Sequence, residues 1–394
     1  MALSSIQTNN KLVQYRTEIV REFVKENMFS PYMGDSATAI IRTLHDNKKG
    51  GEQINIPLVT RLRNTATGAS GTLVGAEEAI DNYGMRVWVD WARHAVATND
   101  AEEQKDSADV FGEAKPLLSD WGKELQRDEI IDALAALPSE SAPAGLGGLN
   151  GQRVNGILAV DATQGNMDTW LEHNFDRVLF GALKSNAESD FDWSDSIVKL
   201  AAGGTDRFLK ANLSLMKRIA STADPNIRPY KTKDGYEWYV AFAGEFAFRD
   251  LKADLASTWQ NAQPREKMDG NPLFQDGDIV YDGVIVRKVP QIDYFVDNVW
   301  KSGTADAFNL KTGGATNARV SPVFLCGQNA AALPWAKMPV PTFRKEDDYG
   351  FIKGAGVKMC YGVSKMFKKH NSKLKQWGVV YGFFASAGDS EGGG

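Results

Sequence analysis

The longest amphipathic pattern in the chain covers residues 100–137. Apolar residues recur there at steps of three and four, which places them on one stripe of a 3.6-residue helix. They are Phe111, Ala114, Leu118, Trp121 and Leu125. Acidic residues near the start suit the helix dipole, and Pro138 follows as a stop. We therefore predict a single helix, roughly 55 Å long at about 1.5 Å per residue, a length typical of a strut.

Two weak helix formers lie inside this pattern. Pro116 has no amide hydrogen for the carbonyl of Gly112, which costs about 3 kcal/mol in a helix interior. Gly112 is itself worse than alanine by about 1 kcal/mol. We predict a bend at Pro116 that either has no role or lets the helix adapt its curvature to different neighbours.

A second pattern, of period two, covers residues 52–96 and predicts strands over 53–62 and 85–96. The alternating apolar positions are Ile54, Ile56 and Leu58, then Met85, Val87, Val89 and Trp91. Pro57 cannot donate a hydrogen bond to a ladder, so its strand should be an edge. Because an isolated two-stranded ribbon is marginal in water, it should fold back on the body or lie on another chain.

The segment between these strands is rich in Thr, Ala and Gly and is flanked by charges of both signs. The charged residues are Arg61, Arg63, Glu77, Glu78 and Asp81. Such a mixture suits docking between like subunits, and it equally suits a solvated hairpin with scattered charge. Both interpretations stay open on composition alone.

The rest of the chain mixes helical and strand patterns and indicates an α+β fold. We predict helices over 13–25, 167–185, 205–223 and 246–259, and strands over 154–160, 236–242, 279–289 and 320–325. Small residues over 139–151 indicate a loop, and residues 349–387 have the pattern of returning strands. The helix over 13–25 either folds on the body or forms an arm that reaches a neighbour.

Composition excludes several classes of function. The 394 residues are 43% hydrophobic and 24% charged, which is ordinary for a soluble protein of two or three domains. The net charge of -5 argues against a surface dedicated to phosphate backbones. No apolar run approaches the ~20 residues of a membrane span, and the start lacks a signal peptide. We expect a cytosolic protein with no membrane contact.

No known catalytic motif is present. Cys326 and Cys360 are too few for a disulfide framework or a four-cysteine zinc site, so we expect both to be reduced and buried. The four histidines, His45, His94, His173 and His370, share no metal-binding spacing. Nucleophile elbows, phosphate loops and dinucleotide fingerprints do not occur. We expect no catalytic, cofactor-binding or metal site.

The best candidate for an unrecognised site is an acidic cluster around Trp193. Asp190, Asp192 and Asp195 could hold a divalent cation, since hard ions prefer clustered carboxylates. The glycine and terminal glutamate of a calcium loop are absent, however, which favours an acidic surface loop. For the alternative of a cytosolic enzyme with an unrecognised site, this cluster would be the best candidate.

Several sequence blocks carry a family resemblance. They are ENMFSPYMG (26–34), INIPLVTRL (54–62), GTLVGAEEAIDNYG (71–84), VDWARHAV (89–96), EEQK (102–105), AKPLLSDW (114–121), SPVFLCG (321–327) and EDDYGFIKGAGV (346–357). These blocks resemble major capsid proteins of tailed double-stranded DNA bacteriophages, of the podophage type with the Hong Kong 97-type fold. The match covers most of the chain and is weakest over 190–275.

The resemblance implies an α+β capsid fold with an N-terminal arm, an extended β loop, a peripheral domain with a long spine helix, and an axial domain. The order of the blocks assigns the arm to 1–50, the extended loop to 51–99, the peripheral domain to 100–199 with its spine helix over 100–137, the axial domain to 200–340, and returning peripheral strands to 341–394.

The implied function is self-assembly into hexamers and pentamers of an icosahedral shell that encloses double-stranded DNA without sequence-specific binding. The protein would lie in the virion after assembly in the host bacterial cytoplasm. Because the arm begins almost at Met1, a separate scaffolding protein is implied, with a portal and a decoration protein as further partners. A shell for protein cargo, as encapsulins form with the same fold, stays open as the alternative.

The extended loop and the spine helix supply the residues that we expect to make assembly contacts. They are Arg61, Arg63, Glu77, Glu78, Tyr83, Trp88 and Pro116. Some capsid proteins crosslink a lysine to an asparagine between subunits, but no residue pair here indicates such a bond.

Overall fold

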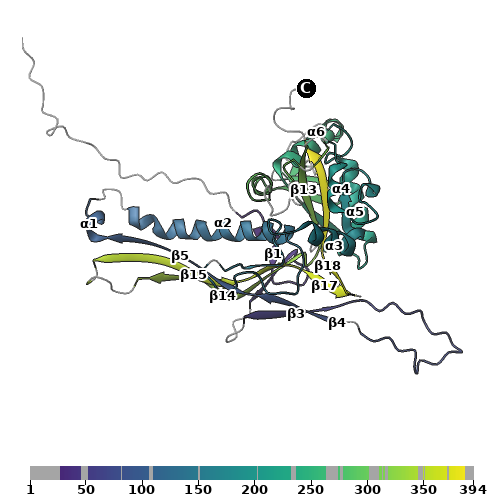
Figure 1. Cartoon of the computed structure of the whole chain (residues 1–394), viewed down its shortest axis with the longest axis horizontal. Coiled ribbons are helices and arrows are strands. Elements are labelled where there is room, and N and C mark those ends of the chain that lie inside the picture. Colours follow the sequence, from purple (N-terminus) through teal and green to yellow (C-terminus); the bar gives the residue numbers. More distant parts are fainter. Residues whose placement is uncertain are drawn as a thin grey trace, which may run out of the picture. The chain divides into compact units, whose positions relative to one another are not determined.

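The computed structural model (Figure 1) describes most of the chain. The described residues are 27–45, 52–80, 82–105, 110–149, 151–201, 203–231, 237–262, 274–275, 278–300, 310–312, 314–315, 318–344, 349, 351–370 and 372–386. The predicted helix over 13–25 and the charge of Asp81 lie outside them. The chain divides into a smaller unit, Met1–Asn27, Trp91–Gln126 and Met338–Met359, and a larger unit, Met28–Asp90, Arg127–Lys337 and Cys360–Gly394.

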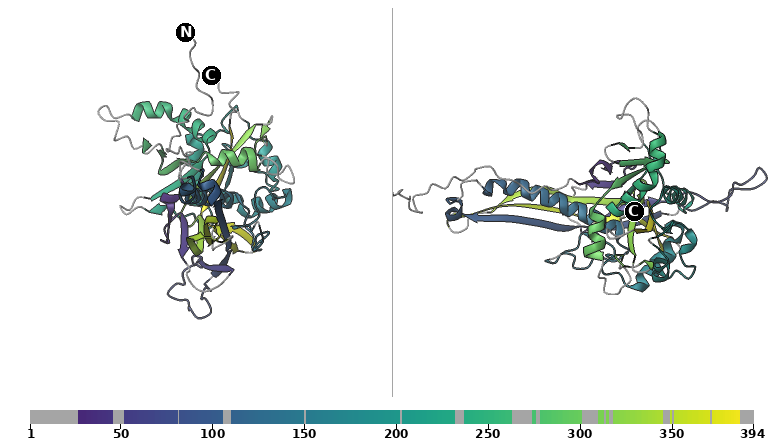
Figure 2. Two further views of the ribbon diagram at one scale, coloured as in Figure 1. Left: turned by 90° about the vertical axis from the view of Figure 1, so that its left-hand side faces the viewer. Right: turned by 90° about the horizontal axis from the view of Figure 1, so that it is seen from above.

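The smaller unit is a helix on a sheet. Its strands are β5 (Asp90–Asn99), the end of β14 (Ala331–Phe343) and most of β15 (Ile352–Tyr361), in the order β14-β15-β5. The right-hand view of Figure 2 shows β5 running alongside its neighbours. Helix α2 (Ala114–Ala135) contributes its first half to this unit and lies on the sheet, where the rings of Trp121 and His94 are 4.8 Å apart. Ala114 and Leu118 of the predicted apolar stripe are buried.

The prediction of one helix over 100–137 is wrong. Helix α1 ends at Glu103, the chain turns at Gln104 and Lys105, and a 3₁₀ helix (Val110–Glu113) precedes α2. The Asn99 side chain caps α1 by accepting a hydrogen bond from the amide of Glu102 at 2.8 Å. At about 1.5 Å per residue, α2 is about 33 Å long.

The premise of the predicted bend, that Pro116 lies in the interior of a helix, is wrong for the same reason. Pro116 is the third residue of α2, in the first turn, where backbone amides have no acceptor within the helix. A proline there loses no hydrogen bond, and its fixed φ favours helix initiation. Pro116 therefore belongs to the start of the helix and does not weaken its interior.

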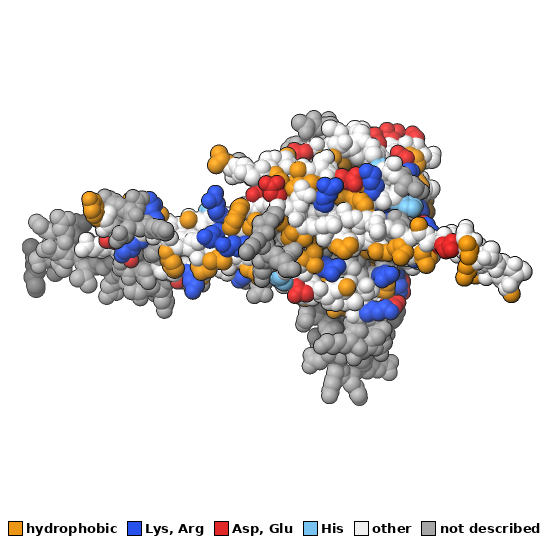
Figure 3. All heavy atoms as spheres, turned by 90° about the horizontal axis from the view of Figure 1, so that it is seen from below, with side chains coloured by type: hydrophobic (Ala, Val, Ile, Leu, Met, Phe, Trp, Pro, Cys, Tyr) orange, Lys and Arg blue, Asp and Glu red, His pale blue; other side chains and the backbone are white. Residues whose placement is uncertain are grey.

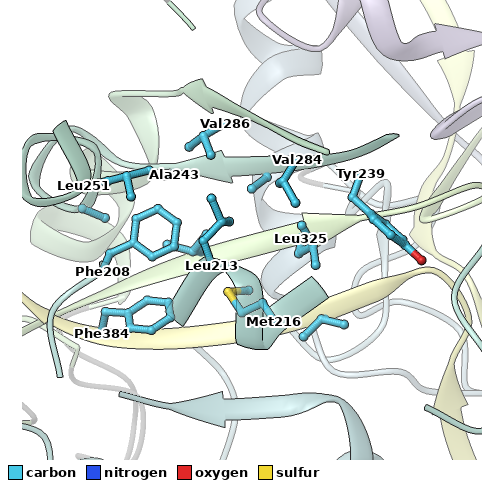
Figure 4. Close-up of a cluster of buried hydrophobic side chains, with 14 of the residues drawn as sticks. Phe208, Leu213, Met216, Tyr239, Ala243, Leu251, Val284, Val286, Leu325 and Phe384 are labelled. Carbon is cyan, nitrogen blue, oxygen red and sulfur yellow. The ribbon is translucent and has the colours of Figure 1, made fainter. Parts of the chain in front are cut away.

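The larger unit is organised around an 8-stranded mixed sheet in the order β10-β11-β12-β9-β13-β19-β7, with β8 on β9. The bounds are β7 Val178–Phe180, β8 Tyr230–Lys231, β9 Glu237–Ala243, β10 Phe274–Gln275, β11 Asp278–Tyr281, β12 Val284–Lys288, β13 Arg319–Cys326 and β19 Val379–Ser386. Helices α5 (Lys210–Thr222) and α6 (Glu245–Ala262) pack on it. Their apolar faces meet the sheet in a cluster that includes Leu213, Met216, Leu251, Leu325 and Phe384 (Figure 4).

Shorter elements surround this sheet. The helices are α3 Gln164–Asn174, α4 Trp193–Val198 and α7 Gln291–Tyr294, with 3₁₀ turns at Ser30–Tyr32, Phe175–Arg177 and Lys184–Asn186 and a π-helical turn at Phe295–Val299. The strands are β1 Met33–Gly34, β2 Ile41–His45, β3 Gln53–Val59, β4 Asn82–Trp88, β6 Val154–Asn155, β16 Val363–Lys365, β17 Phe367–His370 and β18 Lys373–Gln376.

Several predicted elements are confirmed and others differ in extent. The helices near 205–223 and 246–259 and the strands near 236–242 and 320–325 are present as α5, α6, β9 and β13, and the returning strands are present as β15 to β19 between Ile352 and Ser386. The helix predicted over 167–185 ends at Asn174, because the chain then enters the buried strand β7. The strand predicted over 279–289 is the hairpin β11–β12, which turns at Asp282 and Gly283 with positive φ. The strand predicted over 154–160 shrinks to β6.

Candidate functional site

The predicted ribbon is confirmed as a separate antiparallel pair of strands, β3 and β4. Ile56 lies opposite Met85, and Pro57 lies opposite Gly84. Since the sheet has only two strands, Pro57 lies on an edge strand as predicted. The second strand, however, ends at Trp88, and the alternation after it belongs to β5 in another sheet.

The paired strands fold back onto the larger unit. Their inward side chains are almost fully buried in a cluster with residues of β14 and β17: Ile56, Leu58, Met85, Val87, Ala332, Met366 and Phe367. The alternative that the strands lie on another chain is therefore excluded for this part of the ribbon. We call residues 53–59 and 82–88 the ribbon base.

Two predicted contact residues serve the ribbon base itself. The Tyr83 hydroxyl donates to Glu140 at 3.0 Å, and Glu140 also pairs with Lys369. Burial and the neighbouring carboxylate raise the pKa of Tyr83. Trp88 is buried, and its backbone amide and carbonyl both bind the side chain of Asn155, at 2.8 and 3.0 Å.

The segment between the two strands, residues 60–81, has a different character, and we call it the ribbon loop. Its described part has no regular secondary structure, and it projects from the ribbon base (Figure 1). Large apolar side chains are exposed along it, from 64% at Leu62 and 68% at Leu73 and Ile80 to 82% at Val74. Figure 3 shows hydrophobic side chains on this projection. Such exposure is unusual for a segment without a binding role.

Three of the four predicted charged contacts already have partners within the chain. The Arg63 guanidinium donates two hydrogen bonds to the Asp224 carboxylate, at 2.8 and 2.6 Å. Glu78 accepts from the amides of Arg63 and Asn64, and Glu77 accepts from the amide of Gly75 at 2.6 Å. The expectation that these charges contact a neighbouring copy remains a prediction.

The smaller unit carries an apolar groove of about 290 Å³ across its three strands. The groove is lined by Ala95, Val96, Ala97, Thr342, Phe343, Arg344, Gly354, Ala355 and Gly356. Alanine and glycine make the hollow, and the Phe343 side chain beside it is 80% exposed. The groove is suited to receive apolar side chains.

The acidic cluster is a helix cap. Asp192 precedes α4 and accepts hydrogen bonds from the amide of Asp195 at 3.0 Å and the hydroxyl of Ser194 at 2.7 Å, which lower its pKa. Trp193 is fully buried. Within the described ranges no group of three or more His, Cys, Asp or Glu side chains is placed to hold a metal ion. The local structure thus accounts for the cluster without a cation.

Sequence patterns missed the buried charges around the second half of α2. Arg153 donates to Glu129 at 2.7 Å, and Lys365 donates to the carbonyl of Leu134 at 3.2 Å. Burial raises the pKa of Asp132, on the same helix, to about 7. A hydrogen bond donated by the Trp300 indole acts in the opposite direction and lowers this pKa, but its effect is smaller. Charged residues within apolar patterns were the available signal, but their partners are far away in sequence.

The two cysteines are free and buried, as predicted, and burial raises the pKa of the Cys326 thiol. Among the described helices, none combines the length and the apolar character needed to cross a membrane.

Comparisons with known proteins identify the family. A family model described as "Phage capsid protein" matches residues 4–381. Among solved structures, the capsid asymmetric unit of cyanophage Pam1 is 31% identical with a TM-score of 0.83, and the alignment covers 99% of this chain and 100% of that one. No match was found among curated proteins.

More distant structures share the fold. The capsid of Ralstonia phage GP4 has a TM-score of 0.67 at 15% identity, covering 98% of this chain and 99% of that one. The head structure of Helicobacter pylori bacteriophage KHP40 has a TM-score of 0.61 at 13% identity, with 96% of each chain covered. These likenesses confirm the α+β fold of Hong Kong 97-type capsid proteins. The chain belongs to the phage capsid protein family, and it is a major capsid protein that forms a multimeric shell, not an enzyme.

Proposed function

We propose that the ribbon loop is the element by which one subunit binds a neighbouring copy in the shell. The observation that carries the proposal is the exposure of Leu62, Leu73, Val74 and Ile80 on a segment with no regular structure. Burying one such side chain on association stabilises a contact by about 1.5–3 kcal/mol. Each contact is repeated in every subunit, so modest individual contacts give a stable shell.

The apolar groove supports the proposal from the receiving side. Its small residues and the exposed Phe343 have the chemistry that the apolar loop side chains require. Arg61 and Glu77 would supply charged contacts at the rim, each worth about 0 to 1 kcal/mol. Charge would then select the register of docking, while apolar burial would supply most of the affinity.

We further propose the arrangement that the family resemblance supports. The subunits would form hexamers and pentamers of an icosahedral shell around double-stranded DNA, assembled in the bacterial cytoplasm with a separate scaffolding protein, a portal and a decoration protein. The net charge of -5 supports a wall that encloses DNA without sequence-specific binding. The proposed divisions are the arm (1–50), the extended loop (51–99), the peripheral domain (100–199 and 341–394) and the axial domain (200–340).

Replacing residues 64–80 by a short Gly-Ser turn tests the role of the loop. The subunit should fold with unchanged circular dichroism and thermal unfolding, because the ribbon base keeps its buried contacts. Electron microscopy should show no shells. A second variant, Leu73→Asp with Val74→Asp, keeps the length of the loop and should also fail to assemble. Normal shells from either variant would contradict the proposal.

A further inference from the structure

The ribbon loop leaves the ribbon base through a neck, which has Arg63 and Asn64 on one side and Glu78 on the other. The carboxylate of Glu78 joins the two sides. Glu78 accepts hydrogen bonds from the amide of Arg63, at 2.7 and 2.8 Å, and from the amide of Asn64, at 2.8 Å. The strand ladder itself ends earlier, at the pair of Val59 and Asn82. Hydrogen bonds to an ionised acceptor are about twice as strong as neutral ones. The two sides of the neck are therefore held together beyond the last strand pair.

A second contact fastens the neck to the larger unit. The Arg63 guanidinium forms a bidentate pair with the carboxylate of Asp224, a residue 161 positions away that follows α5. Two parallel hydrogen bonds between planar groups fix orientation as well as distance. The side chains of Arg63 and Asp224 are 43% and 50% exposed, so the pair contributes mainly geometry and little stability.

Hydrogen bonds to both the backbone amide and the backbone carbonyl hold Asp224 in place. Its amide donates to Asp176 at 3.0 Å. Its carbonyl accepts from Arg177 at 2.8 Å and from Lys375 at 3.1 Å. Arg177 is completely buried, so this network is anchored in the packed interior of the unit. Asp224 thus offers Arg63 a carboxylate whose position is fixed.

We infer that Arg63 and Asp224 form a clamp that sets the direction in which the ribbon loop projects from the free subunit. A loop without regular structure samples many directions, and ordering it on binding costs free energy. A clamp that restricts these directions before assembly removes part of that cost. The inference rests on the proposed role of the loop in assembly, but loop direction is a property of the free subunit and is measured there.

Double electron–electron resonance in the free subunit tests the clamp. Spin labels are attached at Thr67→Cys and Ser221→Cys, and the distribution of distances between the two labels is measured. The parent should give a narrow distribution, and Arg63→Ala and Asp224→Ala should each broaden it. The double variant should broaden it no further, because both changes remove the same contact. Arg63→Lys, which keeps the charge but loses the planar fork, should fall between parent and Arg63→Ala.

Arg61→Ala is the matched control, because Arg61 has the same charge two positions away and reaches Asp224 only through its field. It should leave the distribution narrow. Arg63→Ala should also raise the concentration needed for assembly by about 3- to 10-fold, or about 0.7–1.4 kcal/mol per contact. An unchanged width in Arg63→Ala, or equal broadening in Arg61→Ala, overturns the clamp.

A broadened distribution with an unchanged assembly threshold overturns the positioning role of the clamp. That outcome is distinct from failure of the proposed function, because the loop replacement tests loop contact without reference to Arg63. A thermal unfolding midpoint that is unchanged from the parent in each variant excludes misfolding as the cause, because the pair is exposed.

Discussion

The ribbon base and the ribbon loop are consecutive in the chain, carry similar apolar residues and have opposite environments. Ile56, Met85 and Val87 of the base are at most 1% exposed, whereas Leu73 and Val74 of the loop are 68% and 82% exposed. The base is covered by the subunit's own core. Within one stretch of chain, therefore, one part belongs to folding of the subunit, and the other exposes apolar surface that we propose is covered by a neighbouring copy.

The difference also shows how a two-stranded ribbon of marginal stability can support a projecting loop. Two strands alone are barely stable in water, but packing against β14 and β17 gives the base a core. The contacts of Tyr83 with Glu140, and of Glu140 with Lys369, hold the end of the base next to the loop. The loop can then extend into solvent without loosening the strands that carry it.

A matched pair of truncations should separate the two parts most strongly. Met85→Ala removes a fully buried side chain from the base and should lower the free energy of unfolding by about 2–5 kcal/mol. Val74→Ala should change it by less than about 0.5 kcal/mol, because the side chain is in solvent. Urea unfolding of the free subunit measures both. Equal losses in the two variants would erase the distinction between base and loop.

Changing pH between 5 and 7 should act on the body of the subunit through Asp132. The pKa of Asp132 is about 7 in the folded protein and about 4 in an unfolded chain, so the folded state binds the proton more tightly. The resulting stability is fully present below about pH 4 and is lost as pH rises toward 7, by at most about 1.4 kcal/mol per unit.

Asp132→Asn keeps an oxygen acceptor for Trp300 and should flatten this dependence between pH 5 and 7. Thermal unfolding at several pH values reports it. A parent protein whose stability does not change over this interval would contradict the assignment to Asp132.

The smallest effect is expected at Pro116. Since this proline occupies the first turn of α2, Pro116→Ala removes no strain and should change the free energy of unfolding by less than about 1 kcal/mol. Particle diameter in electron micrographs should be unchanged. Stabilisation of about 3 kcal/mol would instead indicate a proline in the helix interior.

The sequence predicts the ribbon well because alternation is a local signal. The faces of Ile54, Ile56 and Leu58 follow directly from period two. The boundary between β4 and β5 after Trp88 does not follow from this period, since apolar alternation continues through Val89 into the next strand. Only the partner strand, which is far away in sequence, distinguishes one sheet from the other.

The long strand β14 was missed for a physical reason. It contains three prolines, and proline cannot donate to a ladder. Pro339 and Pro341 lie beyond the register with β2, which ends at Trp335, and so avoid the loss of hydrogen bonds on that side. Before α2, likewise, one periodic stripe concealed the end of α1 at Glu103 and the turn at Gln104 and Lys105.

Contacts between distant residues are the part of the site that no sequence pattern contains. Arg63 was predicted as a charged contact, but its bond to Asp224 joins residues 161 positions apart. The buried pair of Arg153 and Glu129 depends in the same way on how α2 meets the larger unit's strands. Family resemblance supplied the fold, whereas these contacts required the structure.

Hydrogen exchange of the free subunit and of assembled shells tests the central claim most directly. Amides of the ribbon base, such as those of Ile56 and Met85, should be protected in both states, because the subunit's own ladder and core already cover them. Amides of residues 65–76 should exchange rapidly in the free subunit and become protected in the shell. If those loop amides exchange equally fast in both states, the ribbon loop is not an assembly contact.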